Sequence, residues 1–284
     1  MFERISRSIE LVKTSWRILM EDKKLLIFPV LSGIVMLIVI ATFILPLIFS
    51  QDALSLATNS VAGIILLFLF YLVSYFVVIF FNVGLITCVN AKLHGKDMTI
   101  GEGLSAAVSH AGSILAWAVI AATVGLVLRM IEDRAGFLGQ IAAGLVGGVW
   151  SLVTMFVVPV LVFEEKGVID AMKSSLALFK KTWGESIVGS LSIGLIFGVI
   201  GIVAFLLMFF AVLTQSHHIL VMYAAIAIFI VLIAILGILS SAMQGIFVTA
   251  LYSYAKTGVV PSAFNRELVE QAFAPKTKVF GGNI

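Results

Sequence analysis

The stretch VAGIILLFLFYLVSYFVVIFFNVGLITCVN occupies residues 61–90 and contains no charged side chain. A membrane-spanning helix needs about 20 apolar residues, because it rises about 1.5 Å per residue through a hydrocarbon core roughly 30 Å thick. This stretch is long enough to cross a bilayer by itself. We therefore interpret it as a transmembrane helix, and it decides the class of the fold.

Five further stretches meet the same requirement or come close to it. Hydrophobic residues make up 61% of the 284 residues and charged residues only 12%, which is too few to cover the surface of a water-soluble chain. The sequence therefore predicts an all-α, polytopic membrane protein built from three helical hairpins. The predicted spans are residues 25–49, 61–90, 113–128, 136–163, 187–213 and 219–254.

The basic residues predict the orientation of these spans. All but two of the 18 Lys and Arg residues lie in residues 1–24, in the loops 92–112 and 164–186, or in the tail 256–284. Loops rich in Lys and Arg stay on the cytoplasmic side of a membrane. We therefore expect a multi-pass protein of the cytoplasmic membrane with both termini in the cytoplasm, and a six-helix domain at 25–255 between a cytoplasmic helix (1–24) and a cytoplasmic tail (256–284) that includes a short amphipathic helix.

Two segments on the basic side have the pattern of amphipathic helices. In the first, Ile5, Ile9, Val12, Trp16, Leu19 and Met20 recur at helical spacing, and in the second Met172, Leu176, Phe179 and Trp183 do so. Basic amphipathic helices with a terminal tryptophan favour the headgroup layer of a membrane. The residues predicted to contact lipid headgroups are Arg4, Arg7, Lys13, Trp16, Arg17, Lys173, Lys180, Lys181 and Trp183.

The even-numbered spans share features that indicate an internal repeat of two spans plus an amphipathic segment. Each span is followed by a glycine, at Gly95, Gly167 and Gly258, and glycine suits the left-handed residue that ends many helices. Thr99 and Glu102 also have the spacing of a capping box.

Aligning the repeats on these glycines brings Asn82, Thr154 and Gln244 to similar depths in the bilayer. An unpaired amide is costly there. Two interpretations are open: each side chain makes a separate interhelical hydrogen bond, or the three converge near the centre of the bundle.

Small residues at four-residue spacing mark two of the spans as packing faces. The fourth span has Gly144 and Gly148, and the fifth has Ser190, Gly194 and Gly198. Such stripes let helix backbones approach closely within lipid. They predict packing of these two helices against each other, with homodimerisation as the alternative.

Two passages resemble a prokaryotic family of six-helix membrane proteins catalogued only as a domain of unknown function. The first is Trp16-Arg17-Ile18-Leu19 with Asp22-Lys23-Lys24-Leu25-Leu26-Ile27-Phe28-Pro29 and Leu31-Ser32-Gly33, and the second runs from Phe80-Phe81-Asn82-Val83 through Gly95 and Thr99 to Glu102-Gly103-Leu104. The resemblance implies a bacterial or archaeal inner-membrane protein. It implies no activity.

Residues that could carry chemistry are sparse, so we predict no catalytic, cofactor-binding or metal-binding site. The single cysteine, Cys88, excludes an intrachain disulfide, and the four histidines lack the spacing of metal ligands. We interpret Glu164, Glu165 and Asp170 as a solvated helix start. The charges from Arg129 to Arg134 predict a salt-bridged hairpin tip.

These features favour a non-enzymatic membrane protein that binds lipid or partner proteins through a basic cytoplasmic collar, and they leave open whether the lipid is anionic. The alternatives left open are a transporter or channel for a small or apolar solute and, less favoured, an enzyme acting on lipid headgroups. We expect no nucleic-acid partner and no cofactor, and we leave a homo-oligomer or a protein partner open.

Overall fold

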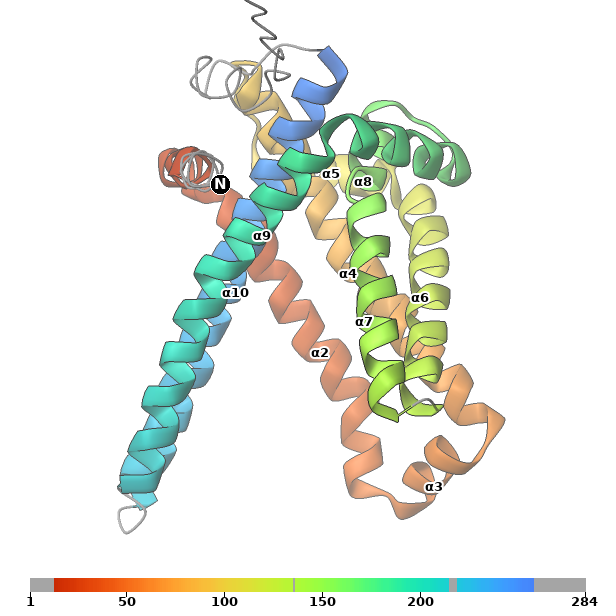
Figure 1. Cartoon of the computed structure of the whole chain (residues 1–284), viewed down its shortest axis with the longest axis vertical. Helices are drawn as coiled ribbons and strands as arrows, with labels where there is room; N and C mark the ends of the chain where they lie inside the picture. The colour runs from red at the N-terminus through yellow and green to blue at the C-terminus, as the bar shows by residue number, and fades with distance from the viewer. Residues whose placement is uncertain (1–12, 135, 215–218, 258–284) are drawn as a thin grey trace, which may run out of the picture.

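The computed structural model describes residues 13–134, 136–214 and 219–257 (Figure 1). All regular secondary structure within these ranges is helical, and six helical stretches there are long and apolar enough to cross a membrane. The prediction of an all-α protein with six spans is thus confirmed.

The first half of the chain forms two long helices, α2 and α4, and several short helical segments. Residues 13–21 are helical, and a 3₁₀ turn leads from them into the first span. The bounds are η1 (Lys23–Leu26), α2 (Ile27–Phe49), α3 (Gln51–Asn59), α4 (Val61–Leu93) and α5 (Ile100–Ser109).

The second half holds the other four spans, of which one is broken and one continues from a helical segment on the far side of a kink. The bounds are α6 (Ala111–Arg134), α7 (Gly136–Val153), α8 (Val157–Phe163), α9 (Val168–Thr214) and α10 (Ile219–Thr257). Together α7 and α8 form the fourth span. A non-helical residue, Thr182, kinks α9 and separates residues 168–181 from the fifth span.

The spans form two arms that are joined at one end. In one arm α4 packs against α6 and α6 against α7, while in the other α9 pairs with α10 as a hairpin. Figure 1 shows the arms converging where α5 and α8 lie and diverging away from that end. We call the joined end the basic end, because the helix ends there carry Lys92, Lys166 and Lys256; α3 lies at the opposite end.

Close helix packing holds the basic end together. Phe28 of α2 is 1% exposed and fills a slot between α4 and α5. A Cβ atom added at Gly84 would lie 2.5 Å from the Phe28 ring, and one added at Gly103 would lie 2.7 Å from it. Only glycine fits at these two positions, because real Cβ atoms do not approach other atoms so closely.

The helix ends at this side agree with the predictions in part. Gly95 follows α4 with a φ of 72°, and the Thr99 backbone N–H donates to Glu102 at 2.6 Å in the predicted capping box. After α8, however, the left-handed residue is Glu165, with a φ of 50°, and not Gly167. Gly258 lies outside the described residues, so the repeat stays a prediction.

Candidate functional site at the basic end

Residues 168–181 of α9, which we call the cross segment, lie across the basic ends of α6 and α8 (Figure 1). The face that packs on the bundle is buried at Ala171, Ser175, Leu178 and Thr182. The predicted stripe of Met172, Leu176 and Phe179 is only half-buried. The buried face is thus shifted by one residue, because small residues at 171 and 175 let the segment approach the spans closely.

The lysines of the cross segment that are predicted to contact headgroups differ in their contacts. Lys173, Lys180 and Lys181 are exposed. Lys173 forms an ion pair with Asp170 at 3.3 Å, and the Lys181 ammonium donates to the Ala255 carbonyl of α10 at 3.5 Å. The Trp183 side chain lies outside the described residues.

The N-terminal helix is described only from residue 13. Lys13, Trp16 and Arg17 are exposed there, whereas Ile18 and Leu19 are buried against the bundle. Arg4 and Arg7 lie outside the described residues. The structure therefore places the basic residues of 13–17 on the surface of the same end as the cross segment, and it leaves their contact with lipid a prediction.

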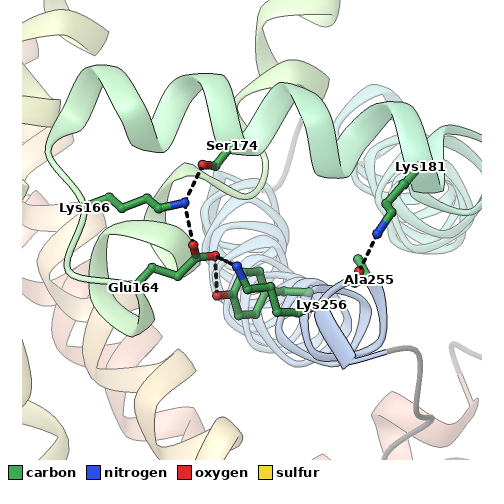
Figure 2. Close-up of polar contacts among 7 residues, drawn as sticks. Glu164, Lys166, Ser174, Lys181, Ala255 and Lys256 are labelled. Carbon is green, nitrogen blue, oxygen red and sulfur yellow. Dashed lines mark hydrogen bonds and ion pairs between the residues drawn. The ribbon is translucent and has the colours of Figure 1, made fainter.

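Glu164, the residue that ends α8, is the centre of a polar cluster that joins α8, α9 and α10. One oxygen of its carboxylate, Oε1, accepts hydrogen bonds from the Tyr252 hydroxyl at 2.9 Å and from the Lys256 ammonium at 2.8 Å. The other, Oε2, lies 2.8 Å from the Lys166 ammonium, which also donates to Ser174 at 2.9 Å (Figure 2). We call Glu164, Lys166, Ser174, Tyr252 and Lys256 the Glu164 cluster.

The carboxylate of Glu164 is strongly acidic in this cluster. Burial acts to raise its pKa, since the side chain is only 11% exposed. The hydrogen bonds from Lys166, Lys256 and Tyr252, with the charge of Lys256, outweigh burial and lower the pKa from 4.5 to about 2. Glu164 is therefore ionised at neutral pH.

The interpretation of Glu164 as part of a solvated helix start is wrong. It treated the acids of this loop as alike, but Glu165 and Asp170 are exposed whereas Glu164 points into the bundle end. A signal was present in the sequence, because Tyr252 and Lys256 are four residues apart and so share one face of the last helix. Nothing in the sequence paired that face with Glu164.

Ser175 of the cross segment closes the break between α7 and α8. Pro159 has no N–H to bond the carbonyl of Met155, four residues earlier, and its ring crowds that carbonyl, so the helix is interrupted at 154–156. The Ser175 hydroxyl donates to the Val153 carbonyl at 2.6 Å and accepts from the Phe156 N–H at 3.1 Å. The cross segment thus satisfies backbone groups that the break would leave unpaired.

The three intramembrane polar residues differ in their surroundings. Thr154 donates to the carbonyl of Trp150 in its own span at 2.7 Å, Asn82 is half-buried and Gln244 is exposed. Asn82 lies one turn from Leu85, whose side chain contacts α10 at Gly245, the neighbour of Gln244. Asn82 and Gln244 therefore lie near the same α4–α10 contact, while Thr154 is bonded within its own helix.

The predicted packing stripes of the fourth and fifth spans do not mediate close helix packing within this chain. A Cβ atom added at Gly144, Gly148, Gly194 or Gly198 would meet nothing within 4 Å. Ser190 is half-buried. The glycines in tight contact lie nearer the basic end, as at Gly189, whose Cβ position the Phe247 ring occupies. Homodimerisation through the open stripes stays a prediction.

Elsewhere the described residues offer little metal or acid–base chemistry. Arg129 and Glu132 form an ion pair at 3.7 Å, as expected for a salt-bridged hairpin tip. Within the described ranges no three His, Cys, Asp or Glu side chains cluster closely enough to hold a metal ion.

Comparison with known proteins gives one match, to a family described as "Family of unknown function (DUF6159)", over residues 61–262. This range includes α4 to α10, and with them the cross segment and the Glu164 cluster. Residues 16–33, the first of the two resembling passages, precede it. None of the curated proteins and none of the solved structures matches the chain.

Proposed function

The chain belongs to this DUF6159 family of unknown function, and we propose that it is a non-enzymatic integral membrane protein that binds anionic lipid headgroups with its basic end. The cross segment carries this proposal. It lies across the ends of the spans (Figure 1) and packs one face on them, and its Lys173, Lys180 and Lys181 are exposed.

The kink at Thr182 supports a position of the cross segment in the headgroup layer. It lets residues 168–181 turn away from the direction of the fifth span while the helix continues. A basic helix in this position attracts anionic lipid, with each Lys or Arg near the surface contributing about 1 kcal/mol.

We place the basic end on the cytoplasmic side of a prokaryotic cytoplasmic membrane, because nearly all Lys and Arg residues lie on that side of the topology that the sequence predicts.

The chemistry of the buried acid supports a non-enzymatic role. Glu164 is held ionised by two lysines, and a carboxyl group with a pKa of about 2 is a poor general acid or base at neutral pH. Its hydrogen bonds join the end of α8 to α10, and Lys166 extends them to Ser174 of α9, as a structural group would do.

The broken fourth span favours transport as the second candidate. Discontinuous helices form the substrate sites of many transporters, and α7 and α8 are interrupted at 154–156. The Ser175 hydroxyl forms hydrogen bonds with the backbone groups of this break. This favours a structural role for the break and leaves transport as the second candidate.

The test is purification in nanodiscs of phosphatidylglycerol and phosphatidylcholine, followed by mass spectrometry of what stays bound. We expect retained phosphatidylglycerol, and about a hundredfold loss of its affinity at low salt in K173Q/K180Q/K181Q, because three lysines at about 1 kcal/mol each amount to about 3 kcal/mol. The matched K173R/K180R/K181R variant keeps the charges and should retain the lipid. Equal retention by the Gln variant would contradict the proposal, and a soluble metabolite in place of lipid would favour transport.

A further inference from the structure

The Glu164 cluster arranges three donor side chains around one anionic group. Ammonium groups of Lys166 and Lys256 approach different oxygens of the carboxylate, each at 2.8 Å, and the Tyr252 hydroxyl donates at 2.9 Å. The Ser174 hydroxyl accepts a hydrogen bond from the Lys166 ammonium at 2.9 Å and so helps to hold that ammonium in place. Two ammonium groups and a hydroxyl around an anion are the kind of donor set that binds a phosphate group.

The cluster is open on the side of its lysines. The Lys166 and Lys256 side chains are 39% and 47% exposed, whereas Glu164 between them is 11% exposed. Figure 2 shows both ammonium groups directed at the Glu164 carboxylate, with Ser174 of the cross segment on the far side of Lys166. An anion from outside would therefore meet the lysines before it meets any other part of the cluster.

We infer that Lys166, Lys256 and Tyr252, with Ser174 holding the Lys166 ammonium, form a phosphate-binding site that Glu164 occupies from within the chain. A phosphate group from an anionic lipid headgroup or from solution would displace the carboxylate and bind the same donors. This site rests on the proposed function only in placing the basic end at the headgroup layer, and its lysines are different from Lys173, Lys180 and Lys181. Glu164 would thus set the phosphate concentration at which the site fills.

The first experiment uses the full chain in detergent with inorganic phosphate as the probe. Thermal unfolding is measured in phosphate and in chloride of equal ionic strength, since a ligand of the folded state raises the unfolding temperature with its concentration. We expect Glu164→Gln to bind phosphate about tenfold more tightly than the wild type. Glu165→Gln is the matched control, because it removes the same charge from the adjacent, exposed position and should behave as the wild type.

The second experiment distinguishes the two sources of phosphate. Glu164→Gln and Glu165→Gln are compared in nanodiscs containing phosphatidic acid or only phosphatidylcholine. Tighter retention of phosphatidic acid by Glu164→Gln identifies a lipid headgroup as the ligand, whereas a gain for inorganic phosphate alone identifies a soluble phosphate. If the double variant Glu164→Gln/Lys256→Gln binds either probe as tightly as Glu164→Gln does, the site is overturned. The site is also overturned if Glu164→Gln binds neither probe more tightly than the wild type.

A further variant keeps the inference testable if Glu164→Gln is too unstable to purify. The double variant Lys166→Gln/Lys256→Gln, made with Glu164 intact, should abolish the smaller rise in unfolding temperature that phosphate causes in the wild type. An undiminished rise would overturn the site.

The variants of Lys173, Lys180 and Lys181 test the proposed function separately. K173Q/K180Q/K181Q should lose phosphatidylglycerol and keep the response to Glu164→Gln, so the failure of one proposal leaves the other measurable.

Discussion

The two halves of α10 carry the same apolar pattern and have opposite surroundings. Toward the basic end, Ala242, Ile246, Thr249 and Ser253 lie on one face and are buried. The same face continues toward the opposite end through Ile228, Val231 and Ile235, which are 68%, 58% and 48% exposed. The helix presents a continuous stripe, but other spans cover only its last part.

The glycines explain where the arms can join. Added Cβ atoms at Gly84, Gly103 and Gly245 would come within 2.8 Å of side chains of neighbouring helices, so these helices approach closely. Along the diverging part of the hairpin, Gly194 and Gly198 face open space. There α10 has an apolar groove of about 410 Å³, lined by Ala227, Ile228, Val231, Leu232 and Ile235. A small residue therefore lies at a close helix contact only where a large side chain of a neighbouring helix packs against it.

The largest expected difference between the regions is between two phenylalanines. Phe28→Ala should lower the free energy of unfolding by about 3–5 kcal/mol, because it empties the slot between Gly84 and Gly103. Phe210→Ala on the hairpin, where the ring is 67% exposed, should change it by less than about 0.5 kcal/mol. Denaturant-induced unfolding of the wild type and of both variants, all in the same detergent, measures the two changes in free energy. Similar losses for the two variants would show that the hairpin is packed as tightly as the basic end.

A smaller effect is expected where the cross segment closes the broken span. Ser175→Ala removes both hydrogen bonds to the break, so it should cost about 1–3 kcal/mol and speed amide exchange at Phe156. Ser151→Ala, at an exposed position of the same span, is the control and should be nearly neutral. Unaltered exchange at Phe156 in Ser175→Ala would mean that the break is stable by itself.

The smallest effect is expected from the titration of Glu164. Its pKa is lowered on folding, so its contribution to stability is complete above the ordinary value of 4.5 and is lost as the pH falls toward about 2. We expect a loss on the order of 1 kcal/mol, because the partner lysines are partly exposed and screened. Unfolding measured across this pH range should show that loss in the wild type and Glu165→Gln. A slope that persists in Glu164→Gln would assign the titration to another group.

The local features of the fold could be predicted from the sequence. Long uncharged stretches predict the spans to within a few residues, and Thr99 with Glu102 predicts the capping box that the structure shows. These predictions succeed because bilayer thickness and helix capping depend only on residues close together in the chain.

Contacts between distant residues escaped the same reasoning. Glycine spacing pointed to Gly144 and Gly194, but the tight contacts are at Gly84, Gly103 and Gly189. The cross segment is buried one residue away from its predicted stripe, on the side where Ser175 reaches the broken span. In each case the deciding factor is the neighbouring helix, which the periodicity of one helix does not identify.

The sequence by itself determined that this chain is a helical membrane protein with six candidate spans, because hydropathy acts residue by residue. Only the tertiary structure decided that Glu164 and Lys166 meet Tyr252 and Lys256, which lie almost ninety residues later in the chain. Hydrocarbon solvates any apolar face, so apolar pattern alone does not choose which faces pair within a membrane. That choice depends on close packing and on polar groups that must find partners, and both require the helices to be assembled.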